Sequence, residues 1–144
     1  MSLAATYDAG NIFAKILRGE LTAVTVFEDE VALAFMDIFP QSRGHLLVIP
    51  KRSAAVNLLD ENPATLQALI VRVQRIARAV VAALEPDGVR IAQFNGAPAG
   101  QTVFHLHFHI IPTYEGAKLA PHAGGKADPA ELEALSAKIR AALT

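Results

Sequence analysis

The sequence contains no cysteine and no tryptophan among its 144 residues. A chain without cysteine can form neither a disulfide nor a thiolate metal site, and this composition fits the reducing cytoplasm. The first residues contain no basic segment leading into an apolar core, so we expect no signal peptide. These absences predict a cytoplasmic protein.

The sequence also lacks a large net charge and any long apolar run. Its 13 Lys and Arg residues nearly balance its 14 Asp and Glu residues, which gives a formal net charge of −1. The chain therefore has no general positive field to hold nucleic acid or an acidic membrane, although one local site can still bind a phosphate. No apolar stretch is long enough to span a bilayer. We expect neither a nucleic-acid partner nor a membrane partner.

What the sequence does contain is an alternation of helix and strand patterns in a globular composition, with 52% hydrophobic and 19% charged residues. Helices are expected at Asn11–Arg18, at Pro63–Leu84 behind the N-cap Asn62, and behind the capping box that begins at Asp128. Strands are expected at Val24–Glu28, Val31–Met36, His45–Ile49, Val89–Phe94 and Phe104–Pro112. The first two strands form a hairpin, so the order predicts an α+β fold with a mostly antiparallel sheet and helices on one face.

The longest expected helix has one apolar stripe at helical spacing. Its members are Leu66, Leu69, Ile70, Val73, Ile76, Ala77, Val80 and Leu84. Arg72, Arg75 and Arg78 lie off the stripe, which is typical of a solvated helix face.

The segment FHLHFHIIP, residues 104–112, places three histidines at every second position. In a strand this alternation predicts an apolar face of Phe104, Leu106, Phe108 and Ile110, and an opposite face of His105, His107 and His109. Packing explains the apolar face, because the helices can cover it. It does not explain three aligned imidazoles.

A metal site and a plain surface are two readings of the histidine face. Zinc holds each histidine nitrogen at about 2 Å, whereas the Cα atoms of His105 and His109 in a flat strand lie about 13 Å apart. All three rings cannot reach one ion, but two neighbours such as His105 and His107 could share one. A metal-binding protein therefore stays open as an alternative, as do polar residues that merely face water.

A site for attack on phosphorus is the third reading. A histidine with an ordinary pKa near 6.5 is mostly neutral and nucleophilic at pH 7. A neighbouring ring can donate a proton or stabilise developing charge. The preceding loop NGAPAGQT, Asn95–Thr102, supplies glycines whose backbone N–H groups can approach an anion, although it is not a Walker loop.

The segment His105–Ile111 resembles the motif of the histidine triad family, in which apolar residues separate and follow three alternating histidines. Three stretches are similar to the bacterial branch close to histidine triad nucleotide-binding proteins: IFAKILRGEL, VFEDEVALAFMDIFPQSRGHLLVIPK and AGQTVFHLHFHIIP. The likeness covers a core of about residues 11–114 and leaves a variable tail, 115–144, within one domain, 1–144. It implies a HIT-like, five-stranded, mostly antiparallel sheet with a long helix, a short N-terminal helix and a C-terminal helix, usually paired into a homodimer.

The resemblance also implies a role for each matching residue. His107 would be the nucleophile that forms a covalent nucleotidyl-histidine, with its other ring nitrogen held by a backbone carbonyl. The other matches are His109 and Thr102 near the phosphate and leaving group, Gln101 and Asn95 at the phosphate, His105 and His45 as support for the nucleophile and its protonation, Asp37 at the ribose, and Phe13, Ile16, Phe35 and Ile38 around the base.

The resemblance also implies that some bacterial members of this family hold a structural zinc ion, and the sequence departs from those members. Their ligand positions correspond to Asn11, Ala14, Ser53 and His105, so three of the four ligands are absent. We expect no such zinc, no cofactor, and a supporting role for His105. His122, in the tail, is expected to be a surface loop residue.

The function expected from this resemblance is hydrolysis at the α-phosphate of purine nucleoside phosphoramidates or related nucleotidyl conjugates, with release of a nucleoside monophosphate. The partner is then a purine nucleotide substrate. Two alternatives stay open, a dinucleoside polyphosphate hydrolase and a nucleotide-binding regulatory module with little turnover.

Overall fold

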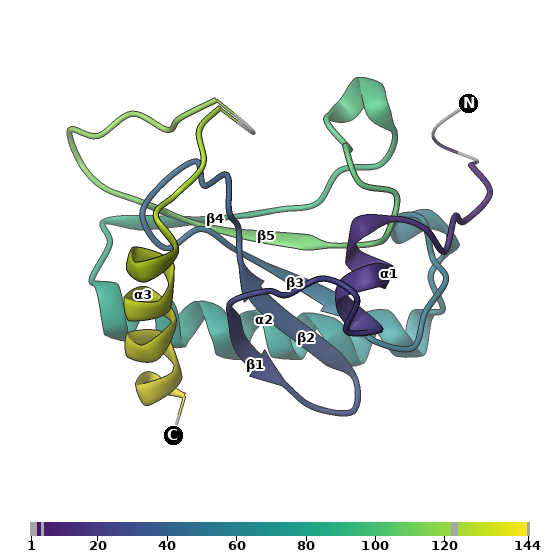
Figure 1. The fold of residues 1–144 in the computed structure, drawn as a ribbon, viewed down its shortest axis with the longest axis horizontal. Helices are drawn as coiled ribbons and strands as arrows, with labels where there is room; N and C mark the ends of the chain where they lie inside the picture. The colour runs from purple at the N-terminus through teal and green to yellow at the C-terminus, as the bar shows by residue number, and fades with distance from the viewer. Residues whose placement is uncertain (1–2, 4, 122–123, 144) are drawn as a thin grey trace.

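The computed structural model describes residues 3, 5–121 and 124–143, so His122 lies outside the described residues. Its centre is a five-stranded sheet in the order β1-β2-β3-β5-β4 (Figure 1). The strands are β1 Thr25–Glu28, β2 Ala32–Met36, β3 Leu46–Pro50, β4 Gly88–Ala92 and β5 Phe108–Thr113. All neighbouring strands are antiparallel, which confirms the predicted α+β fold.

Within the described part of the chain, three α-helices accompany the sheet: α1 Ile12–Leu17, α2 Pro63–Leu84 and α3 Pro129–Ala142. The short 3₁₀ helices η2 Leu58–Asp60 and η3 Ala97–Ala99 lie in connecting loops. The side chain of Asn62 accepts a hydrogen bond from the backbone N–H of Ala64, and proline follows at the first helical position, so α2 begins where its capping residues predict.

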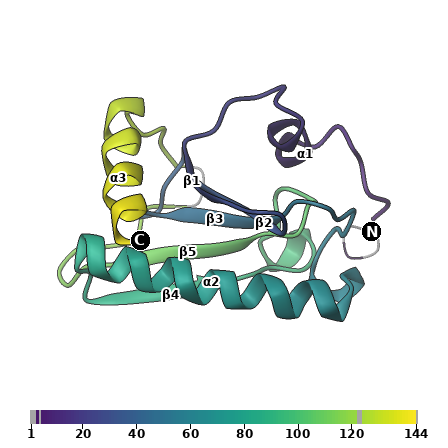
Figure 2. The same ribbon diagram turned by 90° about the horizontal axis from the view of Figure 1, so that it is seen from below.

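The helices cover both faces of the sheet, which corrects the prediction that they lie on one face. Figure 2 shows α2 along one face and α1 on the other side. The cause is that every residue of β2 and β3 is buried, so both faces of these central strands are apolar. Alternate residues therefore need cover on opposite sides.

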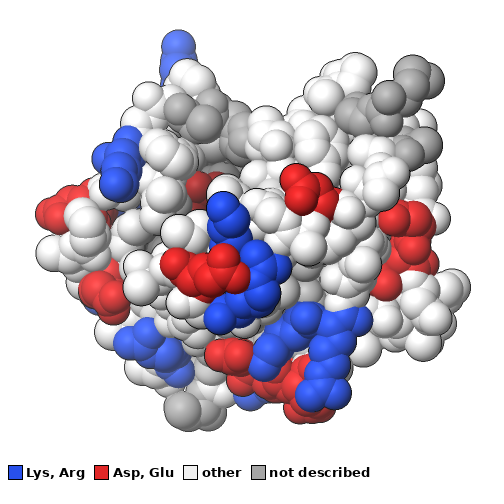
Figure 3. Space-filling view, turned by 45° about the vertical axis from the view of Figure 1, so that its right-hand side comes forward, with Lys and Arg blue, Asp and Glu red and all other residues white. Residues whose placement is uncertain are grey.

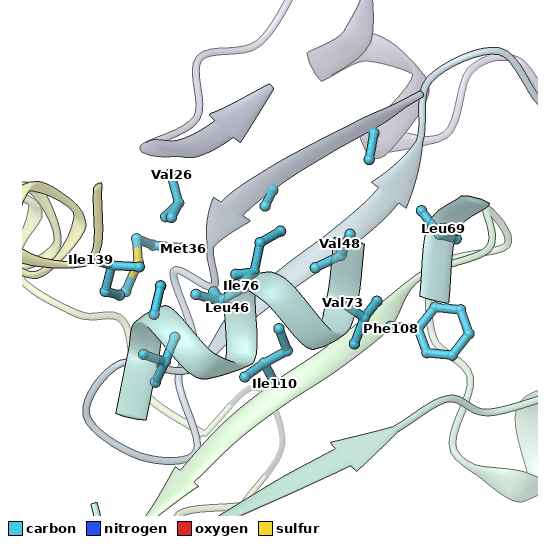
Figure 4. Close-up of a cluster of buried hydrophobic side chains, with 14 of the residues drawn as sticks. Val26, Met36, Leu46, Val48, Leu69, Val73, Ile76, Phe108, Ile110 and Ile139 are labelled. Carbon is cyan, nitrogen blue, oxygen red and sulfur yellow. The ribbon is translucent and has the colours of Figure 1, made fainter. Parts of the chain in front are cut away.

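The larger apolar cluster lies between the sheet, α2 and α3. Figure 4 shows α2 residues Leu69, Val73 and Ile76 directed toward strand residues such as Leu46 and Ile110. Each such side chain contributes about 1.5–3 kcal/mol when it is fully buried. The smaller cluster, on the opposite face, contains Phe13, Leu33, Phe35, Leu47 and Ile49. This second cluster carries α1 and, as described below, one wall of a cleft.

The histidine strand is shorter than predicted, because β5 begins only at Phe108. Strand β4 ends at Ala92, so the segment before Phe108 has no ladder partner on that side. The backbone N–H of Leu106 instead donates to the carbonyl of Ala55 at 3.0 Å. The two-residue alternation nevertheless persists, since Leu106, Phe108 and Ile110 all belong to the larger cluster.

Two other expected core residues are placed differently. Ile70 of α2 has 46% of its surface exposed, because it lies where the helix faces β4 at the edge of the sheet. Phe104 is half-buried and belongs to neither apolar cluster of the described residues, because it precedes the strand.

Gly44 shows how tightly the turn before β3 is packed. Its φ is +93°, and a Cβ placed there would lie 2.4 Å from Leu84 Cδ1 and 3.2 Å from Pro112 Cγ. We expect Gly44→Ala to lower the free energy of unfolding by about 2–4 kcal/mol, because backbone strain and overpacking add. Gly19 has φ +79° but no atom within 4 Å of its Cβ position, so Gly19→Ala isolates the strain alone. Urea denaturation checks this; equal losses in both variants would contradict the packing argument.

Charged side chains of both signs share the surface. Figure 3 shows basic and acidic groups side by side on one face, without an extended area of one sign. Lys51 pairs with Glu28 at 2.6 Å, and Arg72 pairs with Asp29 at the same distance. Arg72 is thus tied down, whereas it was expected simply to face solvent. Among the described helices, none combines the length and apolar character that crossing a membrane requires.

Candidate active site

A cleft of about 430 Å³ opens between α1 and the face of the sheet that carries the smaller cluster. Eight of the twelve sequence-predicted site residues line it: Phe13, Ile16, Phe35, Asp37, Ile38, Thr102, His107 and His109. Most of the wall is apolar, and the polar groups gather at the end formed by the histidine segment. A flat, largely apolar group with a polar extension suits such a space.

His107 lines this cleft, and the backbone holds one of its ring nitrogens. Its Nδ1 lies 2.7 Å from the backbone carbonyl oxygen of His105, so Nδ1 carries the proton and donates it to that carbonyl. Nε2 therefore carries the lone pair in the neutral ring. The edge of the ring packs against Phe13, with centroids 5.0 Å apart and planes at 85°. The ring is thus oriented on two sides, as nucleophilic attack requires.

His109 belongs to a chain of hydrogen bonds that defines its proton. The backbone N–H of Gln41 donates to His45 Nδ1 at 3.0 Å, so His45 carries its proton on Nε2. His45 Nε2 lies 3.0 Å from His109 Nδ1, which must then accept. The neutral His109 ring therefore carries its proton on Nε2. The centroid of that ring is 5.0 Å from that of His107, so the two rings are direct neighbours.

Asp37 lies at the junction between this chain and the cleft. Its Oδ1 accepts from the backbone N–H of Phe39 at 2.8 Å, and its Oδ2 is 3.5 Å from His45 Nε2. Asp37 is 9% exposed and lines the cleft, so its carboxylate can accept hydrogen bonds from a hydroxyl-bearing ligand.

His105 is fully buried and does not line the cleft. Its Nε2 lies 3.2 Å from the carbonyl oxygen of Pro50, and its Nδ1 lies 2.7 Å from the hydroxyl oxygen of Tyr7. Burial lowers the pKa of His105 below its ordinary value and outweighs the Pro50 carbonyl and Glu61, which act in the other direction. A neutral ring with a proton on Nε2 satisfies both partners.

The loop residues Asn95 and Gln101 lie outside the cleft lining, and both brace the backbone. The Gln101 amide oxygen accepts from Gly96 N–H at 2.8 Å, and its nitrogen donates to the carbonyls of Val56 and Val103. Asn95 Oδ1 accepts from the backbone N–H of Leu58 at 3.0 Å. These bonds hold the loop that precedes the histidine segment.

Sequence reasoning missed several residues that the structure brings to the site. Gln41 and Tyr7 each hold a histidine, and Phe39 and Leu47 extend the apolar lining. Leu47 alternates with its core neighbours in a strand, so its side of the sheet could have been derived. Tyr7 lies 98 residues from its partner, and no local periodicity signals such a contact.

The described residues contain one cluster that could hold a metal ion: Asp37, His45 and His109, whose ligand atoms lie within 4.8 Å of one another. Zinc would need lone pairs on both rings. The His45 proton that donates to His109 occupies that space, so an ion would have to replace this hydrogen bond. His105 likewise has each ring nitrogen beside a protein oxygen, and Asn11, Ala14 and Ser53 supply no thiolate or imidazole. The donor set at these positions does not suit a structural zinc ion.

Comparison with known proteins gives three kinds of likeness. The model of the HIT domain matches residues 18–116. The crystal structure of a Hit-like protein from Bartonella henselae superposes with a TM-score of 0.91 at 50% sequence identity, covering 96% of this chain and 99% of the other. The adenosine 5'-monophosphoramidase hnt1 of Schizosaccharomyces pombe is 43% identical over 70% of this chain and 72% of its own length. The adenylylsulfatase HINT3 of Arabidopsis thaliana is 39% identical over 72% of this chain and 52% of its own length.

Proposed function

Because the chain belongs to the HIT, or histidine triad, family, we propose that it is a nucleotide-binding hydrolase acting at the α-phosphate of purine nucleoside phosphoramidates or related nucleotidyl conjugates. The observation that carries this proposal is the His107 ring, which lines the cleft and whose Nδ1–H donates to a carbonyl, so that Nε2 carries the lone pair of the neutral ring. The names of the two similar enzymes, a phosphoramidase and an adenylylsulfatase, support an adenylyl-type substrate.

In the proposed reaction, His107 Nε2 attacks the α-phosphorus and forms a nitrogen–phosphorus bond as the bond to the leaving amine breaks. His109, in its imidazolium form with a second proton on Nδ1, gives its Nε2 proton to that amine and becomes a neutral ring. The His109 ring then takes a proton from water as the water attacks phosphorus, which breaks the bond to His107 and releases a nucleoside monophosphate. The hydrogen bond from His107 Nδ1–H to the His105 carbonyl stabilises the charge on the His107 ring during both steps.

Binding of the substrate follows the division of the cleft. A purine ring fits between the apolar side chains Phe13, Ile16, Phe35 and Ile38, and the Asp37 carboxylate is placed to accept from ribose hydroxyls. Thr102, exposed at the rim, is proposed to face the leaving group. Gln101 and Asn95 hold the loop before the histidine segment in shape, and the phosphate contact that the resemblance implies for them stays a prediction.

The proposal is tested with the purified protein and a substrate panel. Adenosine 5'-phosphoramidate, an adenylyl sulfate and a dinucleoside polyphosphate are incubated separately, and release of nucleoside monophosphate is followed by chromatography. We expect the phosphoramidate to give the highest kcat/KM, with a nucleotidyl adduct on His107 detected by mass spectrometry after an alkaline quench. Highest activity on the dinucleoside polyphosphate would favour that alternative. Nucleotide binding without turnover of any member would favour a regulatory module and overturn the proposal.

A homodimer is part of this proposal. Strand β4 is at the sheet edge, and the exposed apolar residues Ile70, Val81 and Ile91 line a shallow groove between it and α2. An unpaired edge beside apolar surface favours strand-to-strand pairing. A cytoplasmic location stays a prediction.

We expect Ile91→Asp to be monomeric at concentrations where the wild type is a dimer, because a carboxylate would be buried in the pairing face. Light scattering measures the mass of each. Leu59 is 65% exposed on η2, away from the groove, so Leu59→Asp is the matched control and should stay dimeric. A dimeric Ile91→Asp variant would contradict this interface.

A further inference from the structure

The N-terminal arm before α1 contacts His105, a buried residue next to the candidate active site. The Tyr7 hydroxyl lies 2.7 Å from His105 Nδ1, although 98 residues separate the two in sequence. The rings are also in contact, with centroids 5.7 Å apart. Tyr7 precedes residues 18–116, the part of the chain that matches the HIT domain model.

The arm is tied down on both sides of Tyr7. Before it, the Asn57 side chain donates to the carbonyl of Leu3 at 3.2 Å, and Asn57 is itself 1% exposed. After it, the Arg18 guanidinium donates to the carbonyl of Ala9 at 2.7 Å. Figure 1 shows the arm running along the end of the molecule into α1. These two hydrogen bonds hold the backbone of the arm on either side of Tyr7, so that its side chain lies against the histidine segment.

The geometry points to Tyr7 as a positioning residue for the nucleophile. The Tyr7 O–H donates to His105 Nδ1, and the opposite nitrogen, Nε2, donates to the Pro50 carbonyl. The His105 ring is thereby held between the arm and the end of β3. The backbone carbonyl of His105 accepts a hydrogen bond from His107 Nδ1–H. Holding His105 in place therefore holds the orientation of the His107 ring.

Burial makes this contact consequential. His105 is fully buried, so a lone pair on Nδ1 without a donor would be left unsatisfied in the interior. The lowered pKa of His105 agrees with a ring that stays neutral and needs such a donor.

Tyr7→Phe tests this inference, which rests on the proposed function for its kinetic part. The variant keeps the ring contact and removes only the hydroxyl. We expect kcat for adenosine 5'-phosphoramidate to fall about tenfold at an unchanged KM, because Tyr7 does not line the cleft. We also expect the ¹⁵N resonance of His105 Nδ1 to move toward that of an imidazole nitrogen without a donor. Tyr114 is the other tyrosine of the chain, and its hydroxyl donates to the Arg43 carbonyl, so Tyr114→Phe is the matched control and should keep kcat within about twofold.

The two readouts separate the possible failures. An active wild type with unchanged kcat per folded molecule in Tyr7→Phe would overturn the positioning role, whatever happens to the melting temperature. An unchanged Nδ1 resonance would overturn the hydrogen bond itself. A wild type that hydrolyses no substrate would instead defeat the proposed function. The Nδ1 resonance would then still decide whether Tyr7 holds His105.

Discussion

Replacing His107 by alanine is expected to lower kcat for adenosine 5'-phosphoramidate by about 10⁴-fold or more, because the variant has no nitrogen to form the covalent intermediate. Only positioning and charge stabilisation would then remain. The base and ribose walls are formed by other residues, so the affinity for a nucleoside monophosphate should change little. Single-turnover kinetics and calorimetric titration measure the two quantities.

The control for this variant is its own fold. His107 is 6% exposed and packs against Phe13, so its truncation leaves a gap at the edge of the smaller cluster. Thermal unfolding must show that His107→Ala is folded at the assay temperature, and retained nucleotide binding shows that the cleft is intact. A folded, binding-competent His107→Ala with wild-type kcat would remove the covalent mechanism.

Much of the fold could be predicted because each element carries local signals. The caps Asn62 and Asp128 begin their helices as expected, and the Asp29-Glu30 dipeptide joins a hairpin. The side on which α1 packs could not be predicted. Both faces of β2 and β3 are apolar, and periodicity then does not say which helix covers which face.

The predicted length of the histidine strand was wrong for a related reason. Alternation describes side-chain direction, and it persists through Leu106 and His107 although no strand partner is present there. Strand pairing depends on where the neighbour ends, and β4 ends at Ala92, far away in sequence. The prediction and the structure therefore agree on which side chains share a face of the segment, and differ on where its backbone joins the sheet.

The site residues divide along the same line. His107 and His109 could be singled out because three alternating imidazoles have no packing explanation. Their partners could not, because Gln41 acts through a backbone N–H and Tyr7 acts from the arm. Any residue type except proline could supply the former, and only the folded chain brings the latter near. Chemistry-bearing side chains can thus be read from sequence, while the groups that fix their protons require the structure.

Those fixed protons lead to a second large effect, at His109. Its Nε2 carries a proton both in the neutral ring, whose Nδ1 accepts from His45, and in the imidazolium form, which is the proposed acid for the leaving group. His109→Gln keeps an oxygen that can accept from His45 but cannot transfer a proton. We expect kcat for the phosphoramidate, whose leaving amine needs a proton, to fall about 10²–10³-fold.

The leaving group is the internal control for His109→Gln. A nitrophenyl ester of the same nucleoside monophosphate releases an anion that is stable without protonation, so the same variant should lose less than about tenfold on it. Steady-state rates on both substrates give the ratio, and the identical nucleotide portion cancels any change in binding. Equal losses on the two substrates would mean that His109 orients the phosphate and does not protonate the leaving group. The proton chain from Gln41 through His45 would then serve to hold the ring in place.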